Sequence, residues 1–157
     1  MAALLLSSVN AFPPAGDHPE LAPNFRGQTL DGERFSAETL RGKVVLIQFW
    51  ATWCHFCRGD QPAVDAVARD YKSRGLVVLA VNVGESKSKV KRYLKESPRE
   101  CNVVAAEDSN LPAMFPSRGF PLYVLIDRDG RVVGKQPGAG GENALRQLLT
   151  KAGLEPE

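Results

Sequence analysis

A Cys-x-x-Cys pair follows directly on an apolar segment, and this junction constrains the fold more than any other feature of the 157-residue sequence. The nearly continuous apolar run covers residues 43–50, and a helical pattern begins with Cys54 and Cys57. Cysteines three residues apart share one face of a helix, where they are close enough to form a disulfide. Because the first turn of a helix stabilises a thiolate, we expect Cys54 to be the attacking sulfur. We expect Cys57 to be more buried, to stay a thiol, and to attack the mixed disulfide that Cys54 forms with a substrate.

The same cysteine spacing supplies half of many structural zinc sites, so the metal alternative depends on the number of further ligands. A structural zinc ion takes four ligands. Outside the motif the sequence offers only Cys101 and His18, which do not form a second ligand pair. We therefore expect redox chemistry at Cys54 and Cys57, and no metal. For Cys101 we expect the usual role of a free cysteine, a small buried apolar residue, with a regulatory or intermolecular role as the alternative.

Length and charge limit the other classes of protein. A chain of 157 residues is large enough for one domain with a substantial core, without disulfides to staple it. The formal net charge is +2 and the Lys and Arg residues are scattered, which argues against a nucleic-acid partner. No apolar run approaches the roughly 18 residues that a membrane-spanning helix needs.

The first residues do not form a complete signal peptide. Residues 1–8 have five apolar residues after Met1 and no basic segment before them. The core of a signal peptide has about 7 to 15 apolar residues. We interpret residues 1–23 as a native N-terminal arm or as the remnant of a signal or membrane anchor, and both alternatives stay open. Proline is frequent in residues 11–24, which disfavours helices and central strands, so we place the domain at residues 24–157.

The motif lies within a strand-helix-strand pattern. Residues 43–50 and 76–83 are almost entirely apolar, as is typical of strands that are buried on both faces. Between them, apolar residues recur at helical spacing, and a glycine ends the helix. This unit predicts a right-handed crossover between two parallel strands.

Shorter elements are expected on both sides of this unit. Asp31-Gly32 between two extended pieces predicts a hairpin, and Ser36 is a candidate N-cap for a short helix that ends at Leu40. Further along the chain we expect a helix at 86–97, a strand at 103–106, a helical turn at 110–115, a hairpin around 127–130 and a final helix after 137–141.

Together these residues resemble the thioredoxin superfamily over roughly residues 24–153. The resemblance rests on Trp-Cys-x-x-Cys at a helix start, a Gly-x-Pro before a hairpin, and a closing helix. The N-terminal hairpin, residues 81–86 and the extra helix and strand up to 106 are similar to the TlpA/ResA-like branch of extracytoplasmic thiol-disulfide oxidoreductases. This resemblance implies an α/β thioredoxin-like fold. Its central mixed sheet is flanked by helices, with an N-terminal β-hairpin and a helix-strand insertion.

The resemblance also implies roles for individual residues. Cys54 takes the position of the nucleophile, Cys57 that of the resolving cysteine, and Pro121 that of a cis-proline facing the disulfide. Trp53 falls on the family's tryptophan. The surface that would bind substrate consists of Trp53, His55, Phe56, Phe120 and Pro121.

Three positions depart from relatives. Thioredoxin has a buried aspartate where this chain has Gln48, which cannot titrate. The ResA-like branch has a carboxylate six residues after the first cysteine, usually a glutamate, which makes Asp60 the expected proton acceptor for Cys57. The alternative is an exposed acid near a helix start. His55 is expected to stabilise the Cys54 thiolate and to make the disulfide more oxidising, with a solvent-facing residue of little effect as the alternative.

The expected function is exchange of the Cys54/Cys57 dithiol with protein disulfides, without a metal or organic cofactor. From the resemblance, the protein is expected to act as a monomeric reductant outside the cytoplasm, with a part in cytochrome c maturation and a membrane thiol-transfer partner. A cytoplasmic location is the alternative. A peroxiredoxin-type peroxidase is a second possibility, although that branch uses Thr-x-x-Cys and this chain has Thr52-Trp53-Cys54. A third is a non-catalytic binding module that uses the same fold.

Overall fold

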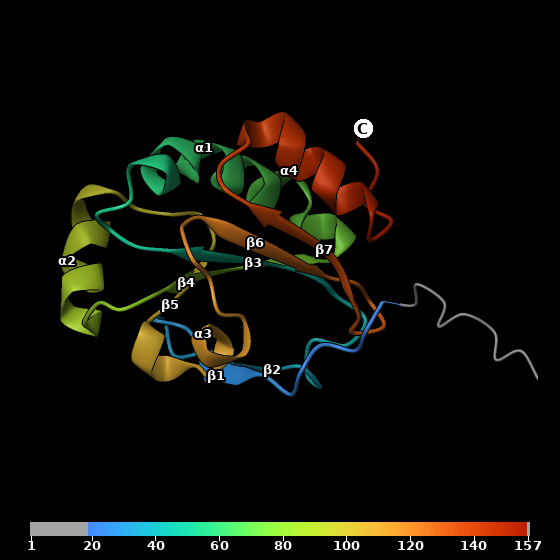
Figure 1. The fold of residues 1–157 in the computed structure, drawn as a ribbon, viewed down its shortest axis with the longest axis horizontal. Helices are drawn as coiled ribbons and strands as arrows, with labels where there is room; N and C mark the ends of the chain where they lie inside the picture. The colour runs from blue at the N-terminus through green and yellow to red at the C-terminus, as the bar shows by residue number, and fades with distance from the viewer. Residues whose placement is uncertain (1–18, 157) are drawn as a thin grey trace, which may run out of the picture.

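The computed structural model describes residues 19–156, which form three layers around one central sheet (Figure 1). Helices α1 (His55–Asp70) and α4 (Gly141–Thr150) cover one face of the sheet. The small strand pair β1 (Arg26–Gln28) and β2 (Arg34–Ser36) lies on the other face with the short helix α3 (Leu111–Met114). Helix α2 (Lys87–Glu96) packs at one end of the sheet.

The central sheet has five strands in the order β5-β4-β3-β6-β7. Strands β3, β4 and β5 run parallel, whereas β6 and β7 are antiparallel to their neighbours. The strands are β3 (Val44–Trp50), β4 (Leu76–Asn82), β5 (Asn102–Val104), β6 (Leu122–Ile126) and β7 (Val132–Pro137). The expected mixed sheet with parallel β3 and β4 around a connecting helix is therefore confirmed.

Strand β3 is buried along its whole length because both faces of the sheet are covered. On one face, Val44 and Leu46 pack with residues of α1 and α4. On the other, Ile47 and Phe49 pack with Phe25 and with residues of α3. A strand with helices on one side and a strand pair on the other needs apolar side chains in both directions, which explains the near-continuous apolar run.

The N-terminal hairpin is present, but the short helix expected after it is not. Residues 37–42 form turns. The Ser36 hydroxyl accepts from the Thr39 amide at 3.1 Å, and the Thr39 hydroxyl accepts from the Ser36 amide at 2.8 Å. These side chains satisfy the local backbone donors, so a helix is not needed to pair them.

The proline-rich lead-in is attached to the turn between β6 and β7. The Glu20 carbonyl accepts from the Val132 amide at 2.9 Å, and the Ala22 amide donates to the Gly130 carbonyl at 2.8 Å. Our interpretation of residues 1–18 lies outside the described residues. Within residues 19–156, no helix is both long and apolar enough to cross a membrane.

Cys101 packs against the two apolar clusters on the helix side of the sheet. Although the residue as a whole is half-buried, burial raises the pKa of its thiol to about 11. A thiol with so high a pKa is a poor nucleophile near neutral pH. Cys101 packs against the core as expected of a small apolar residue, but it is half-buried rather than buried.

Candidate active site

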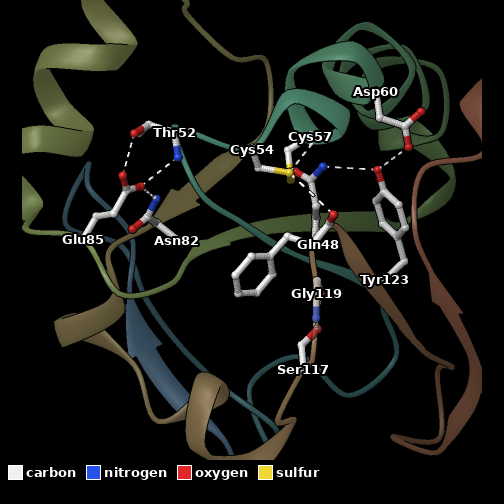
Figure 2. The surroundings of a disulfide bond; sticks show 11 residues. Gln48, Thr52, Cys54, Cys57, Asp60, Asn82, Glu85, Ser117, Gly119 and Tyr123 are labelled. Atoms are coloured by element: carbon white, nitrogen blue, oxygen red, sulfur yellow. Dashed lines mark hydrogen bonds between the residues drawn. A yellow bond between two sulfur atoms is a disulfide. The ribbon is translucent and has the colours of Figure 1, made fainter.

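The two cysteines of the motif form a disulfide at the start of α1 (Figure 2). Their Cα atoms are 5.2 Å apart. Cys54 is the N-cap of the helix, and its Sγ accepts a hydrogen bond from the Cys57 amide at 3.1 Å. A free backbone N–H directed at a sulfur stabilises negative charge on it, so the helix start favours a thiolate at Cys54.

Burial does not separate the two sulfurs as the sequence led us to expect. Cys54 is 4 % exposed and Cys57 is 3 % exposed. The expectation that Cys57 is the more buried of the two is met only marginally, because the loop before β6 covers Cys54 as well. The Phe120 carbonyl oxygen lies 3.5 Å from Cys54 Sγ. What distinguishes the cysteines is the helix-cap hydrogen bond to Cys54.

Pro121 follows a cis peptide bond after Phe120, as the resemblance implied. Around the disulfide, Trp53 is 65 % exposed and Phe56 is 68 % exposed, which is unusual for large apolar side chains. The rings of Trp53 and Phe120 meet edge to face with centroids 6.0 Å apart. We refer to Trp53, Phe56 and Phe120 as the aromatic rim.

His55 is exposed at the first position of α1. Its ring meets that of Phe56 at 5.8 Å between centroids, in an edge-on arrangement. The histidine thus extends the aromatic rim on the solvent side of the motif.

Asp60 is buried, so the alternative of an exposed acid near the helix start is wrong. Its Oδ2 accepts from the Tyr123 hydroxyl at 2.6 Å and from the Gly140 amide at 3.4 Å, and its Oδ1 accepts from the Gly141 amide at 2.8 Å. Three donors compensate for the loss of water around the carboxylate. Asp60 also lies on the same face of α1 as Cys57, three residues away.

Tyr123 connects Asp60 to Gln48 (Figure 2). Gln48 stands at the position where thioredoxin has a titratable aspartate. Gln48 and Tyr123 are partners in the β3–β6 register, and Gln48 Nε2 donates to Tyr123 Oη at 3.2 Å. Burial raises the pKa of Tyr123, and its hydrogen bond to Asp60 raises it further. The phenol therefore stays neutral and remains a donor to the carboxylate.

Comparison with known proteins agrees with this geometry. Residues 14–149 match the Redoxin family. The chain belongs to this family. It is 32 % identical over 128 residues to the thiol-disulfide oxidoreductase ResA of Bacillus subtilis, an alignment that covers 82 % of this chain and 72 % of the relative.

Two solved structures show the same fold. One is a thiol:disulfide interchange protein of the thioredoxin family from Chlorobium tepidum, with a TM-score of 0.76, 32 % identity, and coverage of 88 % of this chain and 99 % of the other. The other is the exposed lipoprotein thioredoxin Etrx1 of Streptococcus pneumoniae, with a TM-score of 0.72, 26 % identity, and coverage of 82 % and 99 %. This redoxin is a ResA-like thiol-disulfide oxidoreductase of the thioredoxin superfamily, and proteins with disulfides are its class of substrate.

A second buried carboxylate in this redoxin was not found by sequence reasoning. Glu85 follows β4, and its carboxylate accepts from the Thr52 amide at 2.8 Å, the Thr52 hydroxyl at 2.5 Å and the Asn82 side chain at 2.7 Å. Lys89 Nζ lies 2.9 Å from it. Burial alone would raise the pKa of Glu85, but the hydrogen bonds from Asn82, Lys89 and Thr52 outweigh it and lower the pKa to about 2.

The sequence gives only a weak signal for these partners. Glu85 is one acid in a polar loop, and Tyr123 is one inward residue of an apolar strand. Their roles depend on which strands are neighbours and in which register, and neither follows from local periodicity.

Proposed function

We propose that this redoxin reduces disulfides in proteins outside the cytoplasm, with Cys54 as the nucleophile and Cys57 as the resolving cysteine. The Cys54 thiolate attacks one sulfur of the substrate disulfide, which forms a mixed disulfide and releases the other substrate sulfur as a thiolate. Cys57 then loses its proton and attacks Cys54, which releases the second substrate sulfur and leaves the Cys54–Cys57 disulfide. The observation that carries this assignment is the Cys57 amide, which donates to Cys54 Sγ.

Asp60 is the proton acceptor for Cys57 in this proposal. Its burial on the Cys57 face of α1 supports the role, because Asp60 and Cys57 lie three residues apart on one side of that helix. Two of its three partners are backbone amides of Gly140 and Gly141, which hold the carboxylate in place whatever its neighbours do. A bridging water would carry the proton from Cys57 to Asp60.

The aromatic rim binds the substrate around its disulfide, together with His55 and Pro121. Large exposed apolar side chains next to a reactive sulfur suit an apolar segment of a partly unfolded protein. Trp53 and Phe56 are the most exposed members of the rim, and Phe120 lies beside Cys54, with its carbonyl oxygen 3.5 Å from the sulfur.

Cellular context follows from similarity. The resemblance to the ResA-like branch supports a part in cytochrome c maturation and a membrane partner that returns electrons to Cys54 and Cys57. That the Streptococcus pneumoniae relative is an exposed lipoprotein supports an extracytoplasmic location. We further propose that the redoxin acts as a monomer and that the cysteine pair alone carries the two electrons, without a metal or organic cofactor.

Reduction of insulin by dithiothreitol tests the activity. We expect the redoxin to accelerate insulin precipitation, and the Cys54→Ser/Cys57→Ser variant to have no effect. A non-catalytic binding module would leave the insulin rate unchanged in both. A thiol peroxidase would instead consume hydrogen peroxide rapidly with the same dithiol and reduce insulin poorly.

A further inference from the structure

The buried amide of Gln48 is satisfied at one end only. Gln48 is fully buried on β3, and its Nε2 donates to the Tyr123 hydroxyl. Its Oε1 has no hydrogen-bond donor among residues 19–156. An unpaired buried acceptor carries a substantial free-energy cost, so the question is which donor serves it in another state of the enzyme.

The direction of this amide follows from its neighbours. The Tyr123 hydroxyl donates its proton to Asp60 Oδ2, 2.6 Å away. The phenol oxygen has no second proton and accepts from Gln48. The NH₂ group of Gln48 must therefore face Tyr123, and Oε1 must face the other way.

On the side away from Tyr123, the Gln48 amide faces the disulfide. Side chains two residues apart on a strand project from the same face, so Gln48 lies on the face of β3 that carries Trp50. Trp50 packs in one cluster with Cys54 and Cys57. Figure 2 shows the Gln48 amide between the disulfide and Tyr123. A disulfide has no proton, which explains why Oε1 is without a donor in this state.

We propose that Gln48 Oε1 accepts a hydrogen bond from the Cys57 thiol when the enzyme is reduced, and so stabilises the dithiol over the disulfide. This inference rests on the proposed roles of Cys54 and Cys57. The added contact completes a row of hydrogen bonds that all run in one direction: Cys57 donates to Gln48, Gln48 to Tyr123, and Tyr123 to Asp60. Tyr123 is then a positioning residue that fixes the orientation of the amide.

The proton on Cys57 comes from the reduction itself. An external dithiol gives two electrons to the Cys54–Cys57 bond, which breaks, and the dithiol becomes a disulfide. Of the two protons that the dithiol releases, one binds Cys57 Sγ and the other goes to solvent, because Cys54 remains a thiolate. The reduced enzyme thus gains one buried S–H group next to the unpaired acceptor.

The charged groups around this row of hydrogen bonds do not reverse its direction. Asp60 on α1 accepts from Tyr123 in the disulfide form. Arg99, between α2 and β5, acts on Tyr123 through its charge and lies over the Trp50 ring at 5.3 Å. Arginine stays protonated at every pH used for thiol exchange. Of the groups around Cys57, Cys54 changes charge during the reaction, and Asp60 does so only in the resolving step, when it takes the Cys57 proton.

Gln48→Met tests the proposal because it keeps the length of the side chain and removes the acceptor. Gln61→Met is the matched control, since the Gln61 amide bonds to the Pro98 carbonyl and to Ser97. The equilibrium with reduced and oxidised glutathione gives the relative stability of dithiol and disulfide. We expect Gln48→Met to shift this equilibrium about tenfold toward the disulfide, and Gln61→Met to shift it less than about twofold.

The S–H stretching band of Cys57 supplies a readout that a general loss of stability would not move. In a Cys54→Ser/Cys101→Ser protein, Cys57 is the one remaining thiol of the 157-residue chain. We expect its infrared band to move to higher frequency in Gln48→Met, as a lost hydrogen bond requires, and to stay in place in Gln61→Met. If Gln48→Met does not fold, Tyr123→Phe serves instead. Without the Tyr123 hydroxyl the Gln48 amide is no longer held with Oε1 toward Cys57. The S–H band of Cys57 should then also move to higher frequency.

An unmoved band in Gln48→Met, or in Tyr123→Phe where that variant is used, would overturn the proposal, whatever the glutathione equilibrium does. The insulin assay on the unmodified redoxin separates the two claims. A redoxin that reduces insulin but shows no band shift loses only the role of Gln48, whereas one that does not reduce insulin loses the proposed function.

Discussion

Glu85 binds both the backbone amide and the hydroxyl of Thr52, at 2.8 and 2.5 Å. Thr52 lies two residues before Cys54, in the turn that leads from β3 into α1. The Glu85 carboxylate therefore fixes the position at which α1 starts. Asn82 and Lys89 hold the carboxylate from the side of β4 and α2, so the active-site turn is connected to two further elements.

Glu85→Gln should destabilise the fold in a pH-dependent way. The folded pKa of Glu85 is about 2, below its ordinary value of 4.5. A lowered pKa means that the ionised carboxylate stabilises the folded state above pH 4.5 and that this contribution is lost as the pH falls toward 2. After allowance for solvent screening, we expect a loss of about 1 to 2 kcal/mol in the free energy of unfolding at pH 7, measured by urea denaturation.

Glu38→Gln is the control, because Glu38 is exposed. This substitution should change the unfolding free energy by less than about 0.5 kcal/mol at pH 5 and at pH 2. The difference between unmodified protein and Glu85→Gln should shrink between pH 5 and pH 2. A difference that is the same at both ends of this range would show that the charge of Glu85 contributes nothing.

Asp60→Asn should slow the resolving step and affect the first attack less. Asparagine keeps the size of the side chain but cannot take the Cys57 proton. The pH dependence of thiol alkylation and of mixed-disulfide resolution measures this, and Asp60→Glu should preserve or improve activity. Asp70→Asn, at the exposed end of α1, is the matched control. If Asp60→Asn and unmodified enzyme give superimposable pH profiles, Asp60 only supports the structure.

Trp53→Ser and Phe56→Ser should weaken substrate binding without changing the reduction potential. Both side chains are mostly exposed, so their loss removes contacts with a substrate and little of the protein core. We expect the KM for a protein disulfide to rise about five- to tenfold for each variant, with the glutathione equilibrium unchanged. Leu21→Ser removes another exposed apolar side chain and should leave the KM unchanged. A KM that these rim variants do not alter would contradict the aromatic rim as a binding surface.

His55→Gly should lower the reduction potential toward the value of about −270 mV found for thioredoxin. An imidazole N–H beside Cys54 stabilises the thiolate and hence the reduced state, and glycine removes that stabilisation. Equilibration with glutathione measures the potential. A change below about 10 mV would mean that His55, which is exposed beside Phe56, acts only at the surface.

Local sequence patterns were sufficient for much of the fold and for the centre of the site. The apolar run before the motif and the helical spacing after it predicted the crossover between β3 and β4. The Cys-x-x-Cys spacing predicted the disulfide, and the resemblance predicted the cis bond before Pro121. Each of these depends on residues that are close in the chain or on one recognisable motif.

Contacts between distant segments could not be predicted in the same way. Tyr123 reaches Asp60 because β6 pairs with β3 in the one register that sets Gln48 opposite Tyr123. The amides of Gly140 and Gly141 reach Asp60 only because the loop before α4 folds over α1. The equal burial of the two cysteines likewise depends on the loop before β6, which is 66 residues from Cys54 along the chain.

Trapping of mixed disulfides tests the central claim most directly. Cys57→Ser and Cys54→Ser proteins would each be incubated with a disulfide-containing protein and analysed by intact mass spectrometry before and after reduction. Cys57→Ser should remain joined to its substrate through Cys54, because the resolving thiol is missing, and Cys54→Ser should trap nothing. Trapping through Cys57 in the Cys54→Ser protein, with none in Cys57→Ser, would contradict the assignment of nucleophile and resolving cysteine.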